Sequence, residues 1–282
     1  MTDHTMRQQT SDNAFDAPHW TESQYARIGV PLLMGMMFLV FWEVMVRVYE
    51  IRHFVLPTPS LIAQTLVKDW YTLAQSLWTT MSLTLIAFVL AVIGGVSLAA
   101  LFSQNRLIEL GLFPYAVVLQ VTPVVAIAPL IIIWVGFDNI DIAMLIMAWI
   151  IAFFPILSNT TIGLKSADHN LRNLFQLYGA SRWQILWHLQ FPSALPYLLG
   201  GMKISAGLSL IGVVVAEFLA SSGNATGLGW RIVEAGFRLN IARMFACLVL
   251  LSLCGIGLFL TMQWLERRLL RSWHESSLKR ES

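Results

Sequence analysis

Six long apolar segments are the feature that most limits what this chain can fold into. They run over about residues 28–48, 77–102, 110–135, 140–162, 197–220 and 241–265. Each supplies the roughly 20 apolar residues that a helix needs to cross a hydrocarbon core about 30 Å thick. Only 12% of the 282 residues are charged, about half the share in an ordinary soluble domain. We therefore expect an all-α integral membrane protein whose domain 28–265 is a six-span helical bundle.

The distribution of Lys and Arg predicts the orientation of these spans. With the N-terminus inside, twelve of these residues fall on the cytoplasmic side and six on the outer side. Both termini are then cytoplasmic, as a polar tail over 1–27 and a basic tail over 266–282. The first tail lacks the short apolar region and small-residue cleavage site of a signal peptide. The net charge of +2 gives no reason to expect a nucleic-acid partner.

The sequence gives little support for chemistry within the chain. It has no G-x-x-x-x-G-K-[ST] phosphate loop, so we do not expect it to bind ATP itself. Its six histidines lie in tails or loops, which leaves no Ser–His pair on facing spans for an intramembrane protease. Cys247 and Cys254 are two helical turns apart, too far for a disulfide. We expect no catalytic residue, cofactor or metal.

The interior connection over about 163–196 predicts a helix–Gly–helix loop. Leu171, Leu174, Phe175 and Tyr178 recur at the spacing of one apolar helix face. Ser166 and Asp168 are candidate caps at its start. Gly179 is expected to stop the first helix, because glycine enters the left-handed conformation at little cost.

A second short helix is predicted after this glycine. Ser181 is its candidate cap, and Pro192 and Pro196 are expected to end it before the fifth span. Its spacing places four side chains on one side: Trp183, Leu186, Trp187 and Gln190. The product is an elbow that projects from the membrane, with one apolar face toward the bundle and another for a partner. A plain amphipathic loop lying on the membrane surface is the simpler alternative.

The stretch 177–201, LYGASRWQILWHLQFPSALPYLLGG, resembles the EAA loop of bacterial ABC importer permeases. Gly179-Ala180 is followed by Pro192, Leu195-Pro196 and two glycines, which is the spacing of that loop, and Asn173 stands where the family has an acidic residue. The resemblance covers about 57–273, through LPTPS, LQVTPVVAIAPLIIIWVGF and VVAEFLASSGNATGLGW. It points to the nitrate/sulfonate/taurine-type branch, which includes permeases for thiamine precursors, riboflavin and aromatic acids.

The resemblance implies a multi-pass permease of the bacterial inner membrane, in contact with lipid, that transports a small, organic solute. Its implied partners are two copies of an ATPase subunit carrying ATP and Mg, a periplasmic solute-binding protein and a second permease. Homodimeric pairing is expected, with a paired non-identical permease left open. The implied ATPase-coupling residues are Asn173, Tyr178, Gly179, Ala180, Ser181, Arg182, Trp183, Pro192 and Pro196.

Polar and proline residues within the spans suggest where a solute passes. Prolines free backbone carbonyls, which membrane proteins tolerate inside protein or beside a wet cavity. The third span carries Gln120, Thr122, Pro123 and Pro129, either as a pathway lining or as a kink for packing. Glu217, in the fifth span, is a candidate gate or packing anchor.

A stand-alone ion-coupled secondary transporter is the alternative. That class often shows repeated halves and ionisable groups at the membrane midplane. The two halves of this chain show no evident similarity, and only Glu43, Arg47 and Glu217 are candidates for ion coupling. Glu43 and Arg47 are also four residues apart, the spacing of a pair that neutralises itself on one helix.

Overall fold

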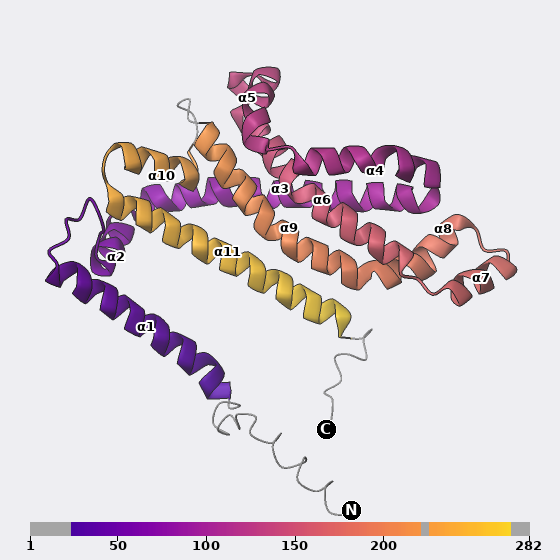
Figure 1. The fold of residues 1–282 in the computed structure, drawn as a ribbon, viewed down its shortest axis with the longest axis horizontal. Helices are drawn as coiled ribbons and strands as arrows, with labels where there is room; N and C mark the ends of the chain where they lie inside the picture. Colours follow the sequence, from indigo (N-terminus) through magenta and orange to yellow (C-terminus); the bar gives the residue numbers. More distant parts are fainter. Residues whose placement is uncertain (1–23, 221–225, 272–282) are drawn as a thin grey trace, which may run out of the picture. The chain divides into compact units, whose positions relative to one another are not determined.

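The computed structural model describes residues 24–220 and 226–271. Most of the two predicted tails and residues 221–225 of the outer glycine-rich loop lie outside these ranges. All regular structure in the described residues is helical (Figure 1), which confirms the all-α prediction. The chain divides into two compact units, residues 1–61 and 62–282.

The first unit contains α1 (Gln24–Val48), whose apolar side chains are mostly exposed. Such a surface fits a lipid environment, where apolar exposure carries no cost. The unit ends at the start of α2 (Pro59–Lys68). Thr58, rather than Ser60, caps α2, because the Leu61 N–H donates to Thr58 Oγ1 over 3.3 Å. The Ser60 hydroxyl, inside α2, donates to the Glu43 carboxylate instead.

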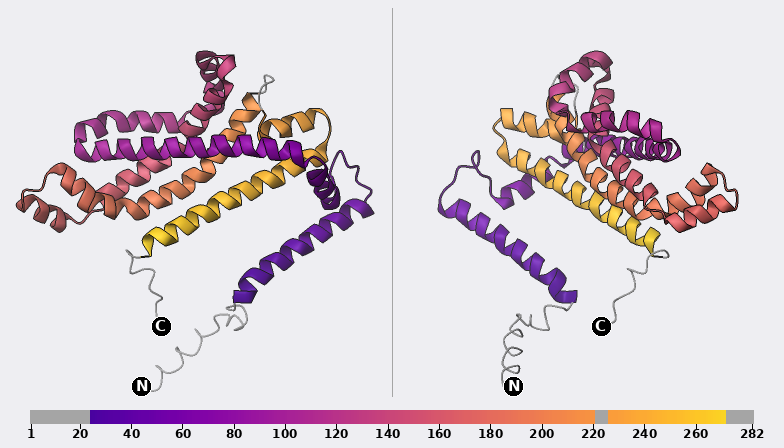
Figure 2. Two further views of the ribbon diagram at one scale, coloured as in Figure 1. Left: turned by 180° about the vertical axis from the view of Figure 1, so that it is seen from behind. Right: turned by 45° about the vertical axis from the view of Figure 1, so that its right-hand side comes forward.

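The second unit is a bundle of long helices with short connections. Its elements in chain order are α3 (Trp70–Gln104), α4 (Arg106–Val121), α5 (Val124–Val135), η2 (Phe137–Asn139), α6 (Ile140–Lys165), α7 (His169–Leu177), α8 (Arg182–Ile185), η3 (Leu186–Gln190), α9 (Phe191–Leu219), α10 (Leu228–Phe237) and α11 (Ile241–Leu270). Figures 1 and 2 show α4 running back along α3 and α5 turning away from both. The elbow α7–α8 and the helix α10 lie at opposite ends of the unit.

The core of the second unit is the contact of α6 with α9 and α3. Glycines allow the α6 and α9 backbones to approach closely. A Cβ at Gly212 would lie 2.8 Å from the Ala148 Cα, and one at Gly163 would lie 2.8 Å from the Ala194 Cα. Gly207 has no atom within 4 Å of such a Cβ, so it makes no close helix contact among the described residues.

Within residues 24–220 and 226–271, five helical stretches are long and apolar enough to cross a membrane, and a sixth span exists if α4 and α5 together form one. These two helices meet at 102°. The predicted third span 110–135 is therefore not one straight helix. Thr122 is extended and Pro123 has no N–H to continue the helix. The six-span count remains a prediction.

The α6–α9 contact predicts different effects of one substitution at two glycines of α9. Gly212→Ala should destabilise the protein by about 1–3 kcal/mol, because the new methyl meets the Ala148 backbone. Gly207→Ala is the matched control and should be neutral or slightly stabilising. Thermal unfolding of both variants in one detergent measures the difference. Equal unfolding temperatures would show that the two helices separate easily.

Candidate functional site

The first helix of the elbow, α7, has the ends that its sequence predicts. The Asp168 carboxylate accepts from the N–H groups of Asn170 (2.6 Å) and Leu171 (3.2 Å), whereas Ser166 bonds back to the end of α6. At the other end Gly179 has a φ of +70°. The N–H groups of Gly179 and Ala180 close a Schellman motif on the carbonyls of Gln176 and Phe175. The elbow therefore has a fixed corner at its glycine.

The second helix of the elbow begins in a capping box. Ser181 Oγ accepts from the Gln184 N–H over 3.3 Å, and Gln184 Oε1 accepts from the Ser181 N–H over 2.7 Å. Ser181 is thus the predicted cap. Arg182 then donates to the Gln104 carbonyl at the end of α3 over 3.1 Å. No local sequence pattern marks that contact, because its two residues are 78 positions apart.

The prolines after the elbow do not end the second helix. The chain stays helical from Arg182 to Leu219, with one π turn at η3, Pro192 in the first turn of α9 and Pro196 inside it. Pro192 lies in the first turn of α9, where proline is tolerated, and Pro196 removes one backbone donor without ending the helix. Our prediction of a helix end at Pro192 and Pro196 is therefore wrong.

The π turn also separates residues that were expected on one side. Trp183 and Trp187 are each 60% exposed, whereas Leu186 and Gln190 are buried. A helix without the π turn would place the four together, as their spacing predicts. The two tryptophans thus stand outward from the elbow.

The outer surface of the elbow is apolar and aromatic. Tyr178 is 85% exposed, and Asn173, Gly179 and Arg182 are also exposed. A groove of about 510 Å³ follows the corner. It is lined by Leu174, Phe175, Tyr178, Gly179, Ala180, Gln184 and His188. An open groove of this kind in a polar loop is a feature of protein-binding surfaces.

Glu217 lies at the other end of α9, fully buried. Its Oε1 accepts from Thr80 Oγ1 over 2.8 Å and its Oε2 from the Gly229 N–H over 2.6 Å. The Thr80 hydroxyl also accepts from the Leu228 N–H over 2.9 Å. A Cβ at Gly227 would overlap the carboxylate. These contacts join the start of α10 to α9 and α3, the geometry of a packing anchor.

A second polar network fixes α10 at the same end. Arg231 donates to Ser76 Oγ of α3 over 3.1 Å and pairs with Glu234 over 2.8 Å. Arg238 approaches the other oxygen of Glu234 to 3.0 Å. The Arg231 hydrogen bond, aided by the charges of the nearby arginines, holds the pKa of Glu234 below its usual range against partial burial. Glu234 is therefore charged at neutral pH.

The predicted pathway residues gather where α4 meets α5. Gln120 and Pro123 are exposed, and Thr122 Oγ1 donates back to the Val118 carbonyl over 2.7 Å. Pro129 is exposed on α5. The buried face of α5 packs in one apolar cluster with Ala216 of α9, beside Glu217 in sequence. The bend and the buried carboxylate thus belong to one region, although no contact joins Glu217 to the four other residues.

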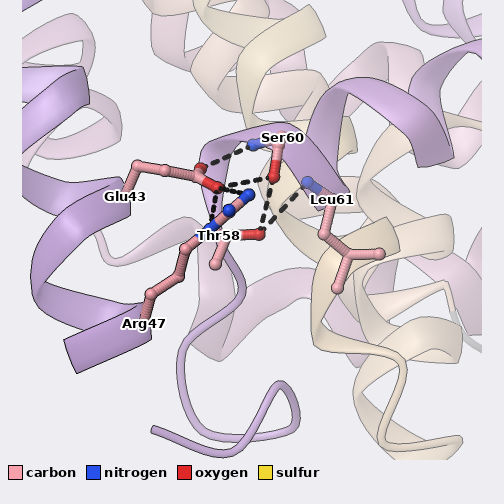
Figure 3. Close-up of polar contacts among 5 residues, drawn as sticks. All are labelled: Glu43, Arg47, Thr58, Ser60 and Leu61. Carbon is pink, nitrogen blue, oxygen red and sulfur yellow. Dashed lines mark hydrogen bonds and ion pairs between the residues drawn. The ribbon is translucent and has the colours of Figure 1, made fainter. Parts of the chain in front are cut away.

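Within the first unit, Glu43 has more partners than its spacing predicts. It accepts from Arg47 Nε over 2.8 Å and from both the backbone N–H (3.0 Å) and the hydroxyl (2.7 Å) of Ser60. Figure 3 shows the carboxylate between α1 and the start of α2. The Glu43 carboxylate therefore links the start of α2 to α1, and its charge is balanced by Arg47 and the Ser60 hydrogen bonds.

Comparisons with known proteins identify the family that this chain resembles. The family described as "Binding-protein-dependent transport system inner membrane component" matches residues 91–271. A protein of Haemophilus influenzae named as an ABC transporter permease is 30% identical, over 87% of this chain and 98% of its own length. The riboflavin transport system permease of Chloroflexus aurantiacus is 34% identical, over 90% and 92%.

Two further matches extend the comparison. A protein of Bacillus subtilis named as an aliphatic sulfonates transport permease is 29% identical over 87% of both chains. Among solved structures, an inward-facing form of the MetNI methionine ABC transporter has a TM-score of 0.61 at 20% identity. The match covers 73% of this chain and 97% of the chain in that structure. At that identity it shows a shared fold.

The anchor at Glu217 predicts that Glu217→Gln loosens α10. An amide cannot accept from both Thr80 and the Gly229 N–H with the strength of a carboxylate, so we expect a loss of about 1–3 kcal/mol. Thermal unfolding measures it. Glu266→Gln is the control. It removes the α11 carboxylate that pairs with Lys203 of α9, and its effect should be smaller because that pair is partly exposed. A Glu217→Gln protein as stable as the unmodified one would contradict an anchoring role.

Proposed function

This chain belongs to the family of binding-protein-dependent transport system inner membrane components, and we propose that its loop 163–196 couples it to a separate ATPase subunit. It is an ABC importer permease of the sulfonate/taurine/nitrate branch. ATP hydrolysis, with ATP and Mg, belongs in this proposal to the partner. The chain itself is a transport subunit and not an enzyme.

The observation that supports this proposal most is the exposed elbow at the end of an uninterrupted helix. The elbow has a fixed corner at Gly179, a capped second helix at Ser181 and an apolar groove with no occupant within the described chain. Its helix continues directly into α9, which lies in the core on α6. A partner that moves the elbow would therefore move α9 as a rigid element.

The proposed assembly contains two permeases and two ATPase subunits, with a periplasmic protein that delivers the solute. A homodimer is favoured over a non-identical pair, because one chain supplies a full bundle. The permease is a multi-pass protein of the inner membrane. Its elbow is assigned to the cytoplasm together with both termini, following the excess of Lys and Arg on that side.

The proposed cargo is a small organic solute of the sulfonate, thiamine-precursor, riboflavin or aromatic-acid type. The named cargoes of the relatives, riboflavin and aliphatic sulfonates, support this range. We assign the pathway to the bend with Gln120, Thr122, Pro123 and Pro129, and place Glu217 beside it. Freed carbonyls and one amide bind a solute weakly enough for release.

An ion-coupled secondary transporter is not favoured by the comparisons. Its candidate groups also have structural partners. Glu43 is engaged by Arg47 and Ser60, and Glu217 by Thr80 and the start of α10.

Purification of the tagged permease in mild detergent, followed by mass spectrometry, tests the ATPase partner. We expect a stoichiometric ATPase subunit. Gly179→Val should reduce its retention roughly tenfold, because a β-branched residue at φ +70° adds about 1–2 kcal/mol of strain to the corner. Uptake of solute should fall with it.

Gly136→Val is the matched control. Gly136 also has a positive φ, +91°, and no atom within 4 Å of an added Cβ, but it lies outside the elbow. It should retain the ATPase. A well-expressed Gly179→Val protein with full retention and uptake would sink the coupling proposal, as would solute movement by the purified permease along an ion gradient.

A further inference from the structure

A polar cavity of about 500 Å³ lies between the elbow and the corner where α3 meets α4. Both ribbon views show these segments adjacent at one end of the second unit. The lining residues are Ser103, Gln104, Asn105, Arg106, Arg172, Gln176, Arg182, Ile185 and Gln190. Three are arginines and none is acidic, so the cavity is strongly electropositive. We refer to it as the arginine pocket.

The charges of the arginine pocket are incompletely neutralised within the described chain. Arg106 pairs with Glu109 over 2.7 Å, but Glu109 also pairs with Lys165. Arg182 donates only to a neutral carbonyl, that of Gln104. Arg172 has neither an ion pair nor a side-chain hydrogen bond to any described residue. Guanidinium groups carry five donors in a fork that matches phosphate oxygens.

The floor of the pocket contains a further unused polar group. Gln190 is 5% exposed and lines the cavity. No hydrogen bond among the described residues involves its side-chain amide. Its amide is therefore available to an occupant of the cavity that accepts or donates hydrogen bonds.

The arginine pocket and the apolar groove use different faces of α7. Arg172 and Gln176, four residues apart, line the pocket, whereas Leu174 and Tyr178 line the groove. At 100° per residue, the two pairs are offset by about 200° on the helix. The apolar groove is therefore on the side of α7 away from Arg172.

The corner beside the pocket is placed for contact with lipid. The 35 residues of α3 span about 52 Å at 1.5 Å per residue, more than a hydrocarbon core of about 30 Å. At least one end of α3 therefore extends beyond the hydrocarbon core, and we assign the Gln104 end to the headgroup level. Leu101, Leu107 and Leu110 flank this corner and are all exposed, which suits acyl chains next to a headgroup.

We propose that the arginine pocket binds the phosphate group of an anionic phospholipid and so links the α3–α4 corner to the elbow. Basic pockets at the cytoplasmic ends of spans bind such headgroups. The inference relies on the proposed function only for the side of the membrane on which the elbow lies.

Native mass spectrometry of the full-length permease tests the proposal with phosphatidylglycerol and phosphatidylcholine of identical acyl chains. We expect phosphatidylglycerol to bind more tightly. Arg172→Gln should weaken it roughly fivefold, and the double variant with Arg106→Gln about 25-fold, from about 1 kcal/mol for each arginine. Phosphatidylcholine binding should change little.

Arg267→Gln is the control, an exposed arginine of α11 at which the same charge is lost outside the pocket. It should bind phosphatidylglycerol as the unmodified chain does. Size-exclusion profiles establish that each variant is folded. Equal phosphatidylglycerol affinity in the double variant, or an equal loss in Arg267→Gln, would overturn the proposal.

Two further measurements distinguish a lipid phosphate from free phosphate, and a lipid from a protein partner. If millimolar inorganic phosphate displaces the lipid, the pocket binds phosphate from either source. If the lipid stays bound, the pocket is specific for the phospholipid. A double variant that keeps its lipid but loses the ATPase would make the pocket a protein contact and overturn the lipid assignment. Lipid binding is measured without the ATPase, so failure of the coupling proposal leaves this result readable.

Discussion

The close contact of the α6 and α9 backbones is the interaction on which the rest of the bundle depends. Lipid tails are as apolar as the side chains of these helices, so the hydrophobic effect does little to bring them together. Dispersion contacts do so, and they require the helices to approach closely. Gly163, Gly201 and Gly212 make this possible, since an added Cβ at each would lie within 3 Å of the facing helix. The contact fixes α9, which contains Glu217 and continues the second helix of the elbow.

The two ends of this one helical stretch have different tasks. At Arg182 it begins in the capped elbow, and near Leu219 it ends beside the buried carboxylate that anchors α10. The chain between them is helical throughout, with a single π turn at η3. Such turns are frequent at functional sites in helices. A force applied at Arg182 would therefore reach Leu219 through continuous helix, with η3 as its one irregular turn.

Local features of this fold could be predicted from sequence, whereas contacts between distant segments could not. Asp168, Gly179 and Ser181 each act within a few residues of their own position. Their residue types therefore predict the start of α7, its end and the start of α8. The helix through Pro192 and Pro196 was missed because a π turn has no sequence signature that we recognised. The Arg182–Gln104 bond and the partners of Glu217 depend on how the helices pack, which one sequence does not reveal.

The buried carboxylates already have hydrogen-bond or ion-pair partners, and this bears on the source of energy for transport. In the described part of the chain the buried and half-buried carboxylates are Glu43, Asp69, Glu109, Glu217, Glu234 and Glu266, and each has an arginine, lysine, hydroxyl or backbone partner. A carboxylate that couples transport to an ion gradient must exchange its partner for that ion, and a saturated one gives up hydrogen bonds to do so. Among the described arginines, Arg172, which lines the arginine pocket, has no ion pair or side-chain hydrogen bond to a described residue. This favours our proposal that energy for transport comes from a partner bound at the elbow over coupling to an ion gradient.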